Sequence, residues 1–170
     1  MEFSFGIPTK IYFGKDCIAK NAGVLAAVGS KAMIVTGKHS AKASGALDDV
    51  TAVLEAEKKE YVIFDEIENN PSVETVAKAA DIARAEKIDF VIGIGGGSPI
   101  DAAKAMWAFY EYPEVTFEQL CTPFSFPKLR QKAKFIAIPS TSGTATEVTA
   151  FSVITDYAKG IKYPLADFEI

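Results

Sequence analysis

Three consecutive glycines, Gly95, Gly96 and Gly97, constrain this chain more than any other stretch of its sequence. An apolar run at residues 90–94 leads into them, and the helical spacing of apolar residues starts just after them, at Ile100. This order predicts a strand, a tight turn and the N-terminus of a helix. Because glycines have no Cβ, the N–H groups of the turn can approach a ligand, and the helix adds free donors and a positive dipole end. The stretch is therefore predicted to bind a phosphate group.

General nucleotide-binding motifs do not describe this glycine run. A P-loop needs Lys after its last glycine and none follows Gly97, which excludes a P-loop phosphotransferase. The dinucleotide fingerprint G-x-G-x-x-G, counted from Gly93, needs glycine where Ser98 stands. The plainer alternative is a tight turn without a ligand, but such turns rarely need three glycines in a row.

Strand-like and helical patterns alternate along the chain, which predicts an α/β fold with helices on both faces of a parallel sheet. The apolar runs typical of buried strands lie at residues 31–35, 61–64, 90–94 and 135–138. Residues 111–134 are irregular and rich in Pro and Phe, and we expect so long a loop either to have a function of its own or to cover another part of the molecule.

Shorter β-type runs occur near both ends of the chain. Residues 3–5 and 10–13 predict an N-terminal β-hairpin. Near the other end, residues 148–155 form either a strand or a loop against the sheet, and residues 159–163 are placed to pair back with them as a hairpin.

Polar loops follow the predicted strands of the sheet, at residues 36–40, 66–70, 95–98 and 140–146. Ligands of parallel α/β sheets gather outside the C-terminal ends of the strands, so we expect these loops to meet around one ligand. In the second loop, Asn70 is interpreted as the cap of the next helix, with Pro71 at its first position.

Composition and charge exclude several classes of function. The net charge of −4 disfavours general binding to nucleic acid or to anionic membranes, and no apolar run approaches membrane-spanning length. Cys17 and Cys121 are expected to be free thiols in a reducing cytoplasm, and the N-terminus has no signal-peptide pattern. His39 is the only histidine, so a His-rich metal site is not expected in this chain.

Residues 70–74, 95–105 and 139–149, in this order, resemble the iron-containing (group III) alcohol dehydrogenases, and residues 153–156 do so too. The resemblance implies a Rossmann-like, dehydroquinate synthase-like domain that binds NAD or NADP. In that family a helical C-terminal half carries iron or zinc on one Asp and three His. Residues 1–170 are therefore expected to form a single nucleotide-binding domain that lacks the metal-binding half, with no catalytic residue and no metal ligand of its own.

The resemblance also assigns cofactor-binding roles to individual positions. The pyrophosphate turn is matched by Gly96, Gly97 and Ser98. A hydroxyl-rich segment that contacts adenine, ribose and phosphate is matched by Ser140, Thr141, Thr144 and Thr149. The nicotinamide side is matched by Asp101, Val153 and Lys162, and a further cofactor contact by Asn70. The plainer alternatives are an acid that complements a helix N-terminus for Asp101, turns and caps for the hydroxyl residues, and a solvated side chain for Lys162.

The loop at Gly37 and Ser40 bears on the choice between NAD and NADP. Family members that prefer NAD place an Asp where Gly37 stands, and that carboxylate accepts hydrogen bonds from the ribose 2′-OH and repels a 2′-phosphate. No acid occurs in residues 36–43, whereas Lys38, Ser40 and Lys42 do. Small, basic and hydroxyl groups suit a phosphate, so a preference for NADP is predicted.

The expected function is the NAD(P)-binding half of an alcohol dehydrogenase that acts on an alcohol/aldehyde pair and is inactive alone. A cytoplasmic homodimer is expected, because the N-terminal strands offer an edge that a partner extends. Two alternatives remain: a stand-alone, non-catalytic nucleotide-binding module, and a fragment of an enzyme like glycerol dehydrogenase or dehydroquinate synthase.

Overall fold

Four parallel strands form the central sheet in the computed structural model, which describes residues 9–170. The strands are β1 (Lys31–Gly37), β2 (Glu60–Ile67), β3 (Phe90–Gly95) and β4 (Lys134–Pro139). Their order across the sheet is β2-β1-β3-β4, so the chain leaves β1 toward one edge and returns at β3 on the other side of β1. This confirms the predicted α/β fold with a parallel sheet.

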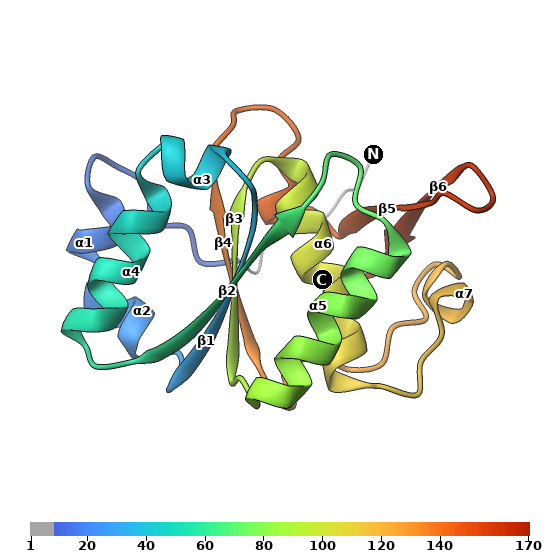
Figure 1. Cartoon of the computed structure of the whole chain (residues 1–170), viewed down its shortest axis with the longest axis horizontal. Helices are drawn as coiled ribbons and strands as arrows, with labels where there is room; N and C mark the ends of the chain where they lie inside the picture. The colour runs from blue at the N-terminus through green and yellow to red at the C-terminus, as the bar shows by residue number, and fades with distance from the viewer. Residues whose placement is uncertain (1–8) are drawn as a thin grey trace, which may run out of the picture.

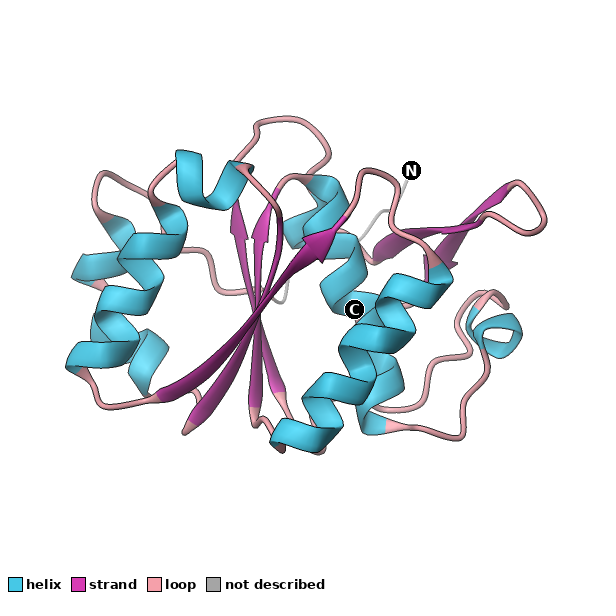
Figure 2. Cartoon of the chain, viewed as in Figure 1, coloured by secondary structure: helices cyan, strands magenta, loops and turns pink. Residues whose placement is uncertain are grey.

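Helices cover both faces of the sheet, which is seen nearly edge-on in Figure 2. One face carries α1 (Cys17–Lys20), α2 (Ala22–Ala26), α3 (Ser40–Ala43) and α4 (Ala46–Ala56), and the other carries α5 (Val73–Glu86) and α6 (Gly97–Glu111) (Figure 1). No helix within residues 9–170 has the length and apolar character needed to cross a membrane.

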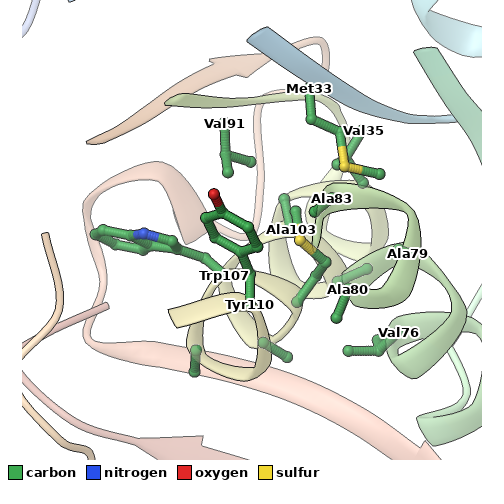
Figure 3. Close-up of a cluster of buried hydrophobic side chains, with 14 of the residues drawn as sticks. Met33, Val35, Val76, Ala79, Ala80, Ala83, Val91, Ala103, Trp107 and Tyr110 are labelled. Carbon is green, nitrogen blue, oxygen red and sulfur yellow. The ribbon is translucent and has the colours of Figure 1, made fainter. Parts of the chain in front are cut away.

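Alternate residues of the strands face opposite cores, as the two-residue period of a strand requires. Ala32 and Ile34 of β1 pack with the α4 side, whereas Met33 and Val35 pack with α5 and α6. Figure 3 shows the core between the sheet and the helices α5 and α6, in which Met33 and Val35 point toward these helices. Both faces of β1 and β3 are buried, which explains their nearly continuous apolar sequence.

Helix α6 lies unusually close to the sheet and is buried along almost its whole length. A Cβ at Gly93 of β3 would lie only 3.1 Å from the Cβ of Ala103 in α6, so a larger residue there would push the helix away. On its other side α6 packs against α5 and against β5 (Phe151–Asp156). The alanines that fill this helix allow close packing on several sides.

The C-terminal hairpin is confirmed. Strands β5 and β6 (Ile161–Ala166) pair antiparallel, with Thr155 opposite Lys162. The long segment before β4 contains a short helix, α7 (Phe117–Leu120), which the sequence did not reveal because it is only one turn long. Buried Phe117, Leu120 and Leu129 show that this segment covers the core, as expected.

Two local predictions differ from the structure. Of the N-terminal hairpin, residues 3–5 lie outside the described part, and residues 10–13 are exposed and form no strand. A strand needs a neighbour to complete its hydrogen bonds, and no described residue supplies one to this segment.

At the start of α5, Ser72 rather than Asn70 is the cap: its Oγ accepts a hydrogen bond from Thr75 N at 3.1 Å. Asn70 instead has φ of 57°, which fits the exclusion of right-handed helical geometry before Pro71.

Candidate functional site

A cavity of about 550 Å³ opens at the C-terminal edge of the sheet, where the connections from β1 and β3 run in opposite directions. Loops after all four strands contribute to it, which confirms that the polar loops meet at one edge. The lining residues are Gly37, Lys38, His39, Ser40, Ile67, Glu68, Asn69, Gly96, Gly97, Ser98, Pro99, Ser140 and Thr141.

The glycine turn forms the floor of this site, and its geometry requires glycine. Gly95 has φ of 144°, and a Cβ there would lie 2.7 Å from Pro99 Cγ. A Cβ at Gly96 would lie 3.2 Å from Thr141 Oγ1, and one at Gly97 would lie 3.0 Å from Thr144 Cγ2. The backbone of the turn is thus packed directly beside two threonine side chains.

The first turn of α6 is suited to an anion. Its N-cap, Gly96, supplies no side-chain acceptor, and the first turn contains no acidic residue. The leading N–H groups of a helix have no partner within the helix and carry the positive end of its dipole. Beside them, Ser140 Oγ is shielded from solvent and has no hydrogen-bond partner among the described residues. These free donors and hydroxyls fit a phosphate-containing ligand.

The loop after β1 brings Lys38, His39 and Ser40 to the opposite side of the cavity. Among the described residues that line the cavity, Glu68 alone carries a carboxylate, which accepts hydrogen bonds from Ser72 N at 2.8 Å and Thr75 Oγ1 at 3.0 Å. Burial acts to raise the pKa of Glu68, but its hydrogen bonds, including those from Ser72 and Thr75, prevail and hold that pKa below its ordinary value. Glu68 therefore stays ionised and anchors the start of α5.

Asn70 joins the glycine turn to the C-terminal hairpin. Its N–H donates to Ser98 Oγ at 3.3 Å, its Oδ1 accepts from Lys162 Nζ at 2.8 Å, and its carbonyl accepts from Tyr157 Oη at 3.0 Å. The cap role predicted for Asn70 is wrong, because its side chain is turned toward Lys162. The same contacts place Lys162 beside the glycine turn.

Asp101 is buried between α6 and β5 and is only 9% exposed. Burial raises the pKa of its carboxyl from 3.8 to about 6, although the Val153 N–H, the Lys104 ammonium and the Thr146 hydroxyl oppose that rise. Ser152 Oγ also donates to the Asp101 carbonyl at 2.8 Å. The groups around this carboxyl thus come from β5, from Thr146 and from Lys104. Asp101 lies beyond the first turn of α6, which differs from the plainer expectation of an acid that complements the helix N-terminus.

The structure divides the sequence-predicted residues into groups. Those that line the cavity are Gly37, Ser40, Gly96, Gly97, Ser98, Ser140 and Thr141. Those adjacent to it are Thr144, through Gly97, and Asn70 with Lys162, through Ser98. Those at the junction of α6 with the start of β5 are Asp101, Thr149 and Val153.

Sequence reasoning missed three residues of this region: Glu68, Asn69 and the buried Lys104. A signal for Lys104 was present, because a lysine three residues after Asp101 lies next to it on a helix whose other residues are mostly apolar. Among residues 9–170, no group of three or more His, Cys, Asp or Glu side chains is arranged to hold a metal ion.

Known proteins resemble this chain over nearly its full length. A family model described as iron-containing alcohol dehydrogenase matches residues 8–170. The NADPH-dependent butanol dehydrogenase of Clostridium saccharobutylicum is 54% identical over 166 residues, which are 98% of this chain and 42% of that protein. The bifunctional aldehyde-alcohol dehydrogenase of Escherichia coli is 43% identical over 173 residues, which cover 96% of this chain and 19% of that protein.

Solved structures give the same picture. An iron-containing alcohol dehydrogenase from Thermotoga maritima superposes with a TM-score of 0.90 at 36% identity, over 98% of this chain and 45% of that one. The NADH-dependent butanol dehydrogenase A of the same organism has a TM-score of 0.88 at 29% identity, over 99% of this chain and 42% of that one. The chain spans less than half the length of these relatives.

Replacing Asp101 should change how stability depends on pH. Burial raises its folded-state pKa from 3.8 to about 6, so the folded chain keeps a proton that the unfolded chain releases. That contribution to stability is complete below the unfolded pKa and is lost as pH rises through the folded one. The wild type should therefore gain stability over Asp101→Asn as the pH is lowered. The difference between their free energies of unfolding should be larger near pH 4 than near pH 7.5, by at most roughly 3 kcal/mol.

Urea denaturation at the two pH values measures this difference. Asp65→Asn, at an exposed position in β2, is the matched control for loss of one carboxylate. A wild-type minus Asp101→Asn difference that is the same at both pH values would contradict the raised pKa.

Proposed function

Since the chain belongs to the iron-containing alcohol dehydrogenase family, we propose that it forms the nucleotide-binding half of such an enzyme. The observation that carries the proposal is the glycine turn at the switch point of the sheet. There the N-terminus of α6 has no side-chain cap, and a Cβ at Gly97 would lie 3.0 Å from Thr144. A backbone with free donors, no side chains and neighbouring hydroxyls suits the pyrophosphate of a dinucleotide.

The remaining site residues would hold the two nucleosides on either side of that turn. The cavity beside β1 and β2 would take the adenosine side, because Gly37 and Ser40 line it. Lys162 and Val153 would lie on the nicotinamide side, where Asn70 ties the C-terminal hairpin to Ser98. When bound, the nicotinamide carries a hydride to or from the substrate carbon. The role of these residues is to bind and orient it.

The described residues do not fit a metal site, so no step of the chemistry is assigned to a metal on this chain. This chain spans less than half the length of its relatives. In the proposal, iron or zinc and an alcohol or aldehyde substrate belong to the longer enzyme. The proposed setting is a cytoplasmic homodimer. Free Cys17 and Cys121 agree with a reducing compartment, and exposed Ile11, Tyr12 and Phe13 offer apolar surface to a second copy.

The proposed nucleotide is NADP rather than NAD. Lys38, His39 and Ser40 line the cavity beside Gly37. Glu68, the only acidic residue within the described part of the lining, is engaged by Ser72 and Thr75. A basic and hydroxylic loop of this kind suits a 2′-phosphate. The relative at 54% identity is NADPH-dependent, whereas the NADH-dependent butanol dehydrogenase is at 29%.

Fluorescence titration of the purified chain should show tighter binding of NADPH than of NADH. Gly37→Asp should weaken NADPH binding by about tenfold or more, because its carboxylate repels the 2′-phosphate, and should leave NADH binding equal or tighter. Gly37→Asn separates charge from size, since a Cβ at Gly37 would lie 3.1 Å from the Ile67 carbonyl. Equal or tighter NADH binding by the wild type would exclude the NADP preference, and equal losses in both variants would exclude the charge effect.

The 170-residue chain alone should not turn over substrate, because its proposed role is to bind a nucleotide and residues 9–170 do not form a metal site. The measurement is the oxidation of NADPH with butanal, with added Fe²⁺ or Zn²⁺, followed by absorbance. A blank with NADPH and metal but no protein is the control. A rate above that blank would show that the chain is itself a complete enzyme.

A further inference from the structure

A lysine lies buried in the middle of α6, outside the cavity already described. Lys104 is only 3% exposed, and its Nζ donates to the carbonyls of Thr149 at 2.6 Å and Phe151 at 3.0 Å. Burial lowers the pKa of Lys104 to about 8, although Asp101 and Glu147 attract its charge and oppose that change. Burying an ammonium is costly unless it is paired, and here two carbonyls and the charges of Asp101 and Glu147 offset that cost.

Other groups of α6 meet the segment that runs from Thr146 to Val153. Ser152, which is fully buried, donates from Oγ to the Asp101 carbonyl at 2.8 Å. The Val153 N–H and the Thr146 hydroxyl lie near the Asp101 carboxylate, where both act to lower its pKa. Together with the two bonds from Lys104, these contacts tie Thr149, Phe151 and Ser152 to α6.

The strand held in this way presents its other face outward. Ser152 and Ile154 are fully buried, whereas Phe151 is 51% exposed and Val153 is 37% exposed. The hairpin that contains these residues meets the glycine turn at Asn70, which contacts both Ser98 and Lys162. A dinucleotide whose pyrophosphate lies on the turn has one nucleoside toward β1 and the other toward this hairpin.

We propose that Lys104 is a positioning residue for the nicotinamide half of the dinucleotide. It fixes the start of β5, and so places Val153 at the edge of the site, without touching the ligand. An apolar side chain in its place would leave the Thr149 and Phe151 carbonyls buried without a donor, so the strand would shift. This inference rests on the proposed function and adds to it a residue that acts from behind the binding surface.

Two probes separate the halves of the site: NADPH, and adenosine 2′,5′-bisphosphate, which lacks the nicotinamide half. For Lys104→Met, the Kd of NADPH should rise by about tenfold or more, whereas the Kd of the bisphosphate should stay within about twofold. The fluorescence gain of bound NADPH, which reports the surroundings of the nicotinamide, should fall as well. Lys128→Met, at an exposed position before β4, is the control and should change neither affinity.

Ser152→Ala removes one contact between α6 and β5 with little change of volume, and it should give the same pattern with a smaller loss. It carries the test if circular dichroism shows that Lys104→Met does not fold. Equal losses for both probes, or unchanged NADPH binding, would overturn the positioning role while leaving the proposed function intact. A wild-type chain that binds neither probe would overturn the proposed function and this inference with it.

Discussion

The close approach of α6 to the sheet is the constraint on which the rest of the structure depends. It requires that Gly93 and Gly95 carry no side chain, because a Cβ at either position would lie 3.1 Å or 2.7 Å from atoms of α6. Once the helix lies there, its N-terminus opens at the switch point between β1 and β3, where a cavity forms. The same helix buries β5 on its far side. The packing of α6 on the sheet thus determines where the anion-binding turn, the cavity and the hairpin lie relative to one another.

The buried charges of α6 are a second consequence of this arrangement. Asp101 and Lys104 lie in a helix whose other residues are mostly alanine and large apolar residues, and each is almost fully buried. Lys104 bonds to the carbonyls of Thr149 and Phe151, and Ser152 bonds to the Asp101 carbonyl, so these positions of α6 act on the position of β5. Buried charges are destabilising compared with apolar packing unless their geometry is well satisfied. Their presence in the helix whose N-terminus opens into the cavity and whose side packs against β5 agrees with a functional rather than a stabilising role.

The parallel sheet and the place of the candidate site could be predicted from the sequence, whereas several local features could not. The parallel strands follow from apolar runs, and the meeting of their loops follows from the rule that ligands lie at C-terminal strand ends. The cap at Ser72, the junction at Asn70 and the short α7 depend on contacts between residues far apart or on single turns. The contacts of Lys104 could not be predicted, because its partners are the backbone carbonyls of Thr149 and Phe151, which no side-chain pattern marks. The strand predicted at residues 10–13 had no described partner to pair with.

The central claim is that the glycine turn holds the pyrophosphate of a dinucleotide. Amide chemical shifts of the chain, followed by nuclear magnetic resonance during titration with NADPH, test it most directly. Large shifts are predicted for the amides of Gly96, Gly97 and Ser98, and adenosine, which has no phosphate, should leave these three amides nearly unchanged. Shifts at these amides no larger than the average over the chain, or equal shifts with adenosine, would contradict the claim.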